Sequence, residues 1–184
     1  MPDEMSAESP DAAPERASQP PRVAIRAFRQ SDIETVAGFE AEIAVASFAD
    51  EAVTDLAHYR KKLGKLLKYG DDWTQVLVVS DTSGAERIAG WAWVAKRQNF
   101  ITGETYADFR SLYVDGASAG PAAAVGLLRA VLAYCEEEGF SRIVGRTATS
   151  NEAMRSLYRL AGFEERHVVY EMDIGPGMSR RPTR

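Results

Sequence analysis

The spacing of hydrophobic positions changes along the chain, and the change separates predicted helices from predicted strands. Residues 33–44 and residues 53–67 repeat apolar side chains at helical spacing, the second stretch with a Lys- and Arg-rich opposite face. Residues 74–80, 87–95 and 106–114 are instead rich in Val, Trp, Tyr and Phe and are separated by glycine-containing turns. The pattern predicts two helices followed by an antiparallel meander.

A first strand is predicted ahead of the helices. Val23, Ile25 and Ala27 alternate with larger or charged neighbours, which is the pattern of a half-buried strand. Ser31 and Glu34 have the spacing of a capping box, which predicts the start of the first helix.

The last third of the chain predicts a strand–helix–strand unit. A long helical pattern covers residues 121–138, with Gly139 placed to end it, and residues 143–146 form the next strand. A helix over 151–161 and a closing strand over 167–174 complete the pattern. Because a strand–helix–strand passage of this length is typical of a parallel crossover, the predicted fold class is α/β. The sheet is expected to be mixed and mostly antiparallel, with one βαβ crossover.

Composition sets the predicted domain limits. Residues 1–21 hold five of the eight prolines and almost no large apolar side chain, which predicts a disordered tail. Residues 175–184 are equally poor in apolar side chains and are expected to form a flexible tail. One domain is therefore predicted over residues 22–174, and its length suffices for a hydrophobic core.

Charge and metal-ligating residues exclude several function classes. The net charge of −5 argues against a nucleic-acid binder, since phosphate recognition needs a basic surface. The single cysteine, Cys135, allows no internal disulfide, and two isolated histidines, His58 and His167, predict no metal site. No apolar run reaches the roughly 18 residues of a membrane span. We expect no membrane partner and a cytoplasmic location.

Two segments carry a resemblance to a known family. The first is Leu112-Tyr113-Val114-Asp115 leading into a long helix. The second is Asn151-Glu152-Ala153-Met154 followed by Leu157-Tyr158-Arg159-Leu160-Ala161-Gly162-Phe163. Together with the order of elements over residues 25–174, they resemble the GNAT superfamily of N-acetyltransferases. The resemblance implies a GNAT-like acyl-CoA N-acyltransferase fold, acetyl-coenzyme A (acetyl-CoA) as cosubstrate and an amine acceptor, either a small molecule or a peptide.

The second segment supplies the expected acid. Asn151 and Tyr158 are seven residues apart, which places them within about 20° of each other on a helix. The resemblance implies that Asn151 contacts the cofactor arm and that Tyr158 protonates the departing thiolate. A phenol suits this task because it stays protonated at neutral pH. The alternative is structural: Asn151 caps the helix, or Thr149 and Glu152 do, and Tyr158 packs in the core.

The resemblance gives the strand before the long helix a second task. In the family this strand is bent by a bulge and splays from its parallel neighbour, so that its backbone binds the pantetheine arm. Here that backbone belongs to Leu112, Tyr113 and Val114, and one of its amides would stabilise the oxyanion of the tetrahedral intermediate. An ordinary buried strand explains the same apolar composition.

The expected pyrophosphate-binding turn departs from the family pattern. The resemblance places it at the start of the long helix, where backbone amides and the helix dipole meet the phosphates. A basic or amide side chain and a second glycine are replaced by alanine, and one residue is a proline without an amide hydrogen. The positions in question are Ala119, Gly120, Pro121, Ala122, Ala123 and Ala124.

The sequence offers more than one candidate for the general base. Asp108 lies on the strand that carries an acidic residue in several family members, so it is the first candidate. Glu40 and Glu42 on the first helix are alternatives, although exposed helical carboxylates are usually surface groups. Trp91 and Trp93 share one face of a strand, where core or dimer packing is expected before an acceptor pocket.

Three functions fit these observations. The first is acetyl transfer to an amine in a ternary complex, with Tyr158 as general acid and Asp108 as base. The second is a GNAT-like module that binds an acyl-CoA or a partner protein without catalysis, which the altered turn favours. The third is an interaction protein that has lost the cofactor. An open sheet edge would also allow a homodimer.

Overall fold

The computed structural model describes residues 22–48, 51–81, 83–120, 122–170 and 172. These residues belong to two compact units, one ending at Arg146 and the other beginning at Thr147. The first unit holds the sheet and most of the helices, and the second holds α5 (Glu152–Leu160). The first unit contains, in order, β1 (Arg22–Ala27), the 3-10 helix η1 (Gln30–Asp32), α1 (Ile33–Phe48), α2 (Leu56–Tyr69), β2 (Trp73–Ser80), β3 (Glu86–Gln98), β4 (Thr105–Val114), α3 (Gly116–Ala119), α4 (Ala123–Glu137) and β5 (Ile143–Gly145).

The sheet confirms the predicted fold class. Its strands follow the order β1-β2-β3-β4-β5, the first three pairs antiparallel and β4 with β5 parallel. The meander turns form where the sequence places Gly84 and Gly103, both with positive φ, a conformation that glycine adopts without strain. The mixed, mostly antiparallel sheet with a βαβ crossover is therefore present.

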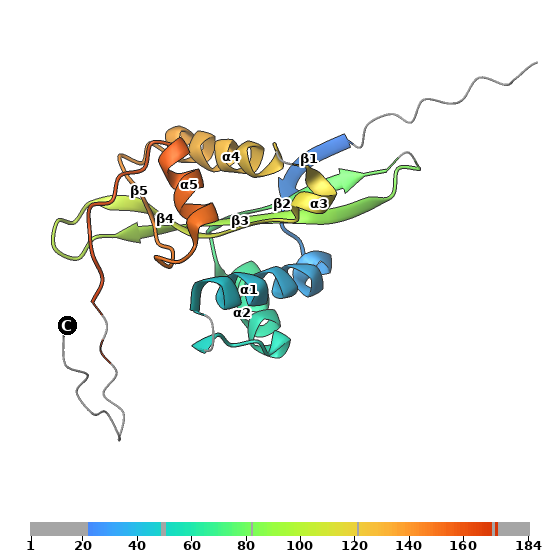
Figure 1. Ribbon diagram of the computed structural model, residues 1–184, viewed down its shortest axis with the longest axis horizontal. Coiled ribbons are helices and arrows are strands. Elements are labelled where there is room, and N and C mark those ends of the chain that lie inside the picture. Colours follow the sequence, from blue (N-terminus) through green and yellow to red (C-terminus); the bar gives the residue numbers. More distant parts are fainter. Residues whose placement is uncertain (1–21, 49–50, 82, 121, 171, 173–184) are drawn as a thin grey trace, which may run out of the picture. The chain divides into compact units, whose positions relative to one another are not determined.

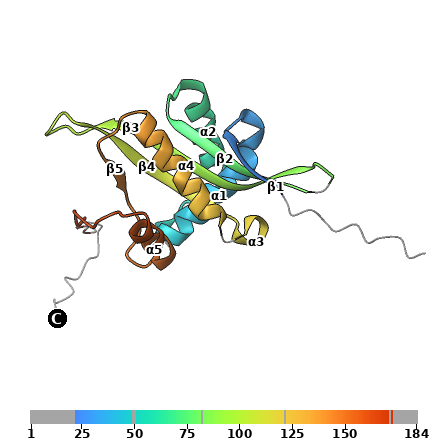
Figure 2. The same cartoon turned by 90° about the horizontal axis from the view of Figure 1, so that it is seen from above.

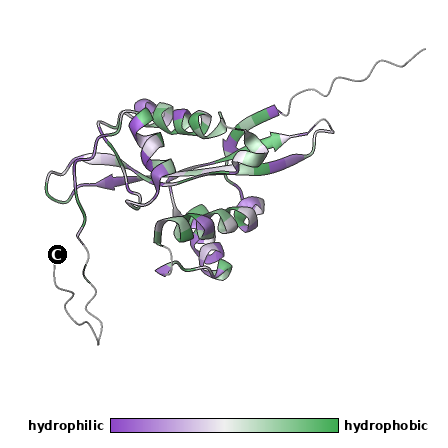
Figure 3. Cartoon of the chain, viewed as in Figure 1, coloured by the Kyte–Doolittle hydropathy of each residue, from purple (hydrophilic) through white to green (hydrophobic). Residues whose placement is uncertain are grey.

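Helices cover both faces of the sheet in the first unit. Figures 1 and 2 show α4 on one face, and Figure 1 shows α1 and α2 on the other. The basic face of α2 is exposed, as predicted. In Figure 3 much of α4 is coloured hydrophobic, since Ala, Val and Leu make up most of its sequence. The structure adds two short elements that the sequence did not predict, the 3-10 helix η1 and the helix α3 between β4 and α4. Asp115 caps α3 by accepting a hydrogen bond from the Ala117 amide.

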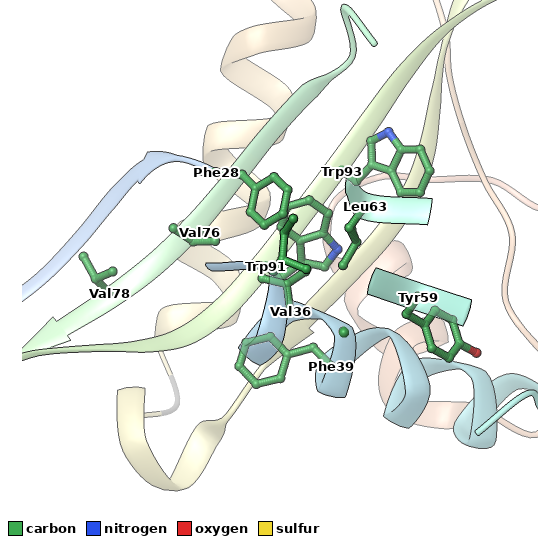
Figure 4. Packing of buried hydrophobic residues seen from close by; sticks show 11 residues of the cluster. Phe28, Val36, Phe39, Tyr59, Leu63, Val76, Val78, Trp91 and Trp93 are labelled. Carbon is green, nitrogen blue, oxygen red and sulfur yellow. The ribbon is translucent and has the colours of Figure 1, made fainter. Parts of the chain in front are cut away.

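The core between the sheet and α1 is built around Trp91. This side chain is fully buried and lies between Phe28 and Val36, with Leu63 of α2 nearby (Figure 4). The rings of Phe28 and Trp91 meet edge to face, with centroids 4.8 Å apart. Trp93 belongs to the same cluster, so the core role expected for both tryptophans is confirmed.

Two expectations at the start of the domain were wrong in detail. β1 forms, but Val23 and Ile25 remain exposed. They lie on the same face of the sheet as α4, but α4 packs on β3 and β4 rather than on this edge strand. The predicted capping box of Ser31 and Glu34 does not form. Instead, the Asp32 carboxylate accepts a hydrogen bond from the Arg29 amide at 2.8 Å, and Glu34 forms an ion pair with Arg60 of α2.

The predicted closing strand over residues 167–174 is also wrong for the residues that the structure describes. Residues 167–170 and Met172 are in no strand, and positions 171, 173 and 174 lie outside the described residues. Val168, Val169 and Tyr170 are each more than two-thirds exposed. Val168, Tyr170 and Met172 do lie at alternating positions, which is why the sequence predicts a strand. Alternation is only a local signal, and these described residues pair with no strand of the sheet.

Candidate active site

β4 carries a bulge at the point where its pairing with β5 ends. Phe109 and Ser111 pair with consecutive residues of β3, so Arg110 is the extra residue of the bulge. The parallel ladder with β5 ends at the pair of Phe109 and Gly145, which we call the apex. The segment of β4 beyond the bulge, Leu112 to Val114, is called the open edge below. The bulge that the resemblance implied is confirmed.

Backbone hydrogen bonds show which amides this open edge presents. The Ala107 amide donates towards β5, to the Arg142 carbonyl at 2.9 Å, whereas the Asp115 amide donates towards β3, to the Ala89 carbonyl at 2.9 Å. Because backbone groups alternate along a strand and the bulge shifts the alternation by one, Leu112 and Val114 point away from β3. Tyr113 pairs with Trp91 of β3. The open edge thus presents two amides, not three.

The turn before α4 has an open backbone but no basic side chain of its own. Gly120 ends α3 with φ of +79°, and Ala122 precedes the first residue of α4, Ala123. Space is open around Gly120: a side chain carbon added there would meet no atom within 4 Å. Ala119 and Ala124 keep the backbone approachable, while Pro121 lies outside the described residues. The turn therefore fits a pyrophosphate by its open backbone and by the positive end of the α4 dipole.

A cation that the sequence analysis missed lies beside this turn. Arg87 of β3 hydrogen-bonds to Ser118 of α3 and approaches Asp115 at 3.5 Å. Hydrogen bonding to Ser118 lowers the pKa of the Asp115 carboxyl, which keeps it ionised next to Arg87. The guanidinium comes from a different strand, so no local motif announces it; only the antiparallel register brings it to α3.

Asp108 lies at the apex and binds two arginines. Its side chain is 5% exposed, and its Oδ2 accepts from Arg110 at 3.0 Å while its Oδ1 accepts from Arg146 at 3.4 Å. The Arg110 guanidinium also lies over the Trp93 ring, 5.5 Å from its centroid. The first candidate base is thus the shared partner of two arginines.

The two glutamates of α1 differ from each other. Glu40, expected on the surface, is buried and accepts a hydrogen bond from the Trp91 indole at 2.8 Å. Glu42 is exposed and accepts from the Tyr113 hydroxyl at 2.6 Å; this bond is the main reason that the pKa of Tyr113 rises to about 12. Glu42 also lines an open hollow of about 340 Å³ on α1, together with Ala41, Val45 and Ala46.

The second unit presents Asn151 and Tyr158 on α5. The Asn151 side chain caps the helix by accepting the Met154 amide at 3.1 Å, so the capping alternative is confirmed and the rival box of Thr149 and Glu152 is not formed. Tyr158 is half-buried, with its ring 4.7 Å from that of Phe163. The cap uses only the carbonyl oxygen of Asn151.

Other candidate chemistry contributes little. Cys135 is buried on α4, and burial raises the pKa of its thiol to about 11, as expected of a small apolar residue. His167 is exposed. Over the described ranges, no group of three or more potential metal-ligating side chains gathers, and no helix is both long and apolar enough to cross a membrane.

Comparison with protein families identifies the chain. The model of the acetyltransferase (GNAT) family matches residues 39–163, which include the apex, the turn and α5. The chain therefore belongs to the GNAT acetyltransferase family, whose members use acetyl-CoA. A search of curated proteins gives no significant match.

Solved structures show the same fold at low sequence identity. A possible acetyltransferase from Clostridium difficile 630 is 17% identical with a TM-score of 0.65, over 83% of this chain and 97% of that one. Aminoglycoside N-acetyltransferase AAC(6')-Iy, in a complex with CoA, is 14% identical with a TM-score of 0.66, over 85% and 98%. Glucosamine-6-phosphate N-acetyltransferase from Arabidopsis thaliana is 16% identical with a TM-score of 0.57, over 84% and 99%.

Proposed function

We propose that the protein is an acetyl-CoA-dependent N-acetyltransferase that acetylates a primary amine by direct attack in a ternary complex. The observation that carries the proposal is the open edge of β4, where a bulge and the end of the β5 ladder leave the Leu112 and Val114 amides directed away from β3. These amides can hold the amide groups of a pantetheine arm, which an ordinary paired strand could not do.

The proposed roles follow the order of the chain. The amides of Ala119, Gly120 and Ala123 already donate to carbonyl oxygens within this part of the chain. The pyrophosphate is therefore assigned to the backbone amides of Ala122 and Ala124 at the start of α4. Leu112 or Val114 donates to the oxygen that becomes negative during attack. The amine nitrogen forms a bond to the thioester carbonyl carbon, the carbon–sulfur bond breaks, and Tyr158 donates its hydroxyl proton to the leaving sulfur. Asn151 contacts the cofactor arm. Tyr158 is the proton donor of this proposal, because the Tyr113 hydroxyl on β4 donates to Glu42 instead.

Asp108 stays the proposed base. A carboxylate offers about four lone-pair sites, and two of those of Asp108 are used by Arg110 and Arg146. The other candidates are engaged by Trp91 and Tyr113, further along β3 and β4 from the apex. Proton removal from the acceptor ammonium would then occur at the apex, directly or through a water molecule.

Calorimetric titration with acetyl-CoA tests the proposal. We expect micromolar binding by the wild type and a loss of at least about tenfold in Ala122→Arg, because a long side chain would fill the open turn before α4. The matched control is Ala133→Arg on the exposed side of α4, which leaves the turn unchanged. Absence of binding by the wild type would reject the transferase and favour the non-catalytic module that binds a partner protein.

Arg87 is expected to replace the missing cation of the turn. Its charge lies next to α3, so Arg87→Ala should weaken acetyl-CoA binding by about threefold to tenfold, equivalent to about 1 kcal/mol for an exposed charge contact. The effect should shrink at high salt, because exposed charges are screened. Lys61→Ala on the exposed face of α2 is the control. Equal affinities of Arg87→Ala and wild type at low salt would remove Arg87 from the site.

A further inference from the structure

We propose that the acceptor carries an oxyanion, a carboxylate or a phosphate, in addition to its amine, and that Arg110 and Arg146 bind this oxyanion at the apex. The proposal rests on the transferase function above and names its substrate class. It starts from the two guanidinium groups that share the buried Asp108 carboxylate.

The charges of Asp108, Arg110 and Arg146 do not cancel at the apex. One carboxylate faces two guanidinium groups, which leaves one excess positive charge in a chain whose net charge is −5. One arginine would suffice to neutralise Asp108. Each guanidinium uses a single nitrogen, Nη1, on Asp108, and a guanidinium has five N–H donors, so further donors of both arginines can face a ligand.

Both arginines are accessible, and each contacts Asp108. The side chains of Arg110 and Arg146 are 37% and 63% exposed, whereas that of Asp108 is 5% exposed. Arg110 is further held by the Trp93 ring, whose indole nitrogen donates to Asp72 at 2.8 Å. A buried carboxylate that orients two exposed guanidinium groups forms a fork suited to carboxylate or phosphate oxygens.

The phosphates of CoA do not explain the pair. The turn before α4 comes after Val114 in the chain. The β3 partners of Val114 and Phe109 are Gly90 and Val94, four residues apart, so about 13 Å of strand separates Val114 from the apex. A pantetheine arm that runs from that turn along the open edge would end at the apex, where the pairing of β4 with β5 ends. Its acyl group, and not its pyrophosphate, would therefore approach the two arginines. The molecule that meets the acyl group there is the acceptor.

The experiment compares amines that differ only in their charge. Ethanolamine phosphate is titrated against ethanolamine, and ω-amino acids of increasing length against their carboxamides, by calorimetry on protein saturated with CoA. Acetylation of the same pairs is followed by thiol release from acetyl-CoA. Comparing the phosphate series with the carboxylate series identifies which oxyanion is preferred. Saturation with CoA is verified first, so that a failure of cofactor binding, which would reject the transferase itself, is recognised separately.

We expect an anionic amine to bind about tenfold to a hundredfold more tightly than its neutral partner, as charge-assisted hydrogen bonds would give. In Arg110→Gln with Arg146→Gln the preference should disappear while CoA affinity is kept. Arg97→Gln is the matched control, since Arg97 lies on β3 beside Asp72 rather than at the apex. Equal binding of charged and neutral partners, no measurable binding of any anionic amine, or a preference that survives in the double variant would overturn the proposal. A lowered melting temperature with an unchanged preference would assign the arginines a structural role instead.

Discussion

Replacing Trp91 with alanine is expected to lower the free energy of unfolding by about 3–5 kcal/mol, the range for removing a large buried aromatic side chain. The upper part of this range applies, because the change removes the edge-to-face contact with Phe28 and leaves the buried Glu40 carboxylate without its indole donor. For a chain of this size the melting temperature should fall by roughly 10–15 °C, which thermal and urea unfolding followed by circular dichroism would measure.

A second substitution separates packing from hydrogen bonding at this position. Trp91→Phe keeps most of the apolar volume but removes the donor to Glu40, so a loss of about 1–3 kcal/mol is expected. If Trp91→Ala cost no more than Trp91→Phe, the cavity would contribute nothing and the described packing of this core would be wrong.

The sequence predicted the strands of the sheet well because their signal is local. Alternation and β-branched content gave the three meander strands within three residues at each end, and the helix that follows them was placed to within two. The face of β1 was not predictable, since which face is covered depends on how far α4 extends across the sheet. Burial of Glu40 was missed for the same reason: its partner, Trp91, is 51 residues away in the chain.

The site divides in a similar way. The turn before α4 and the pair of Asn151 and Tyr158 could be proposed from the sequence, because the turn is contiguous and Asn151 caps the helix that carries Tyr158. Arg87 and the partners of Asp108 could not, because residues of different elements come together there only through strand register. A bulge residue such as Arg110 has no periodicity of its own, so its part at the apex follows only from the pairing of β4 with β3.

Tyr158→Phe should lower kcat for acetyl transfer by about 10²–10⁴-fold, the usual contribution of a positioned general acid. The phenylalanine ring retains the contact with Phe163, so α5 and the affinity for acetyl-CoA should remain unchanged. Thiol release, measured with an amine that the wild type acetylates, reports kcat, and calorimetry reports the affinity. Tyr170→Phe is the matched control, because this tyrosine is 91% exposed and should behave as wild type.

The two readouts of Tyr158→Phe separate its possible roles. A fall in kcat with unchanged cofactor affinity is the result for a proton donor, since the hydroxyl then acts only as the thiolate leaves. Weaker binding with unchanged kcat would instead make the hydroxyl a contact of the cofactor arm. A kcat within about threefold of the wild type would exclude the acid role, because so small a loss, under 1 kcal/mol, is less than a positioned general acid supplies. Protonation of the thiolate would then have to come from water.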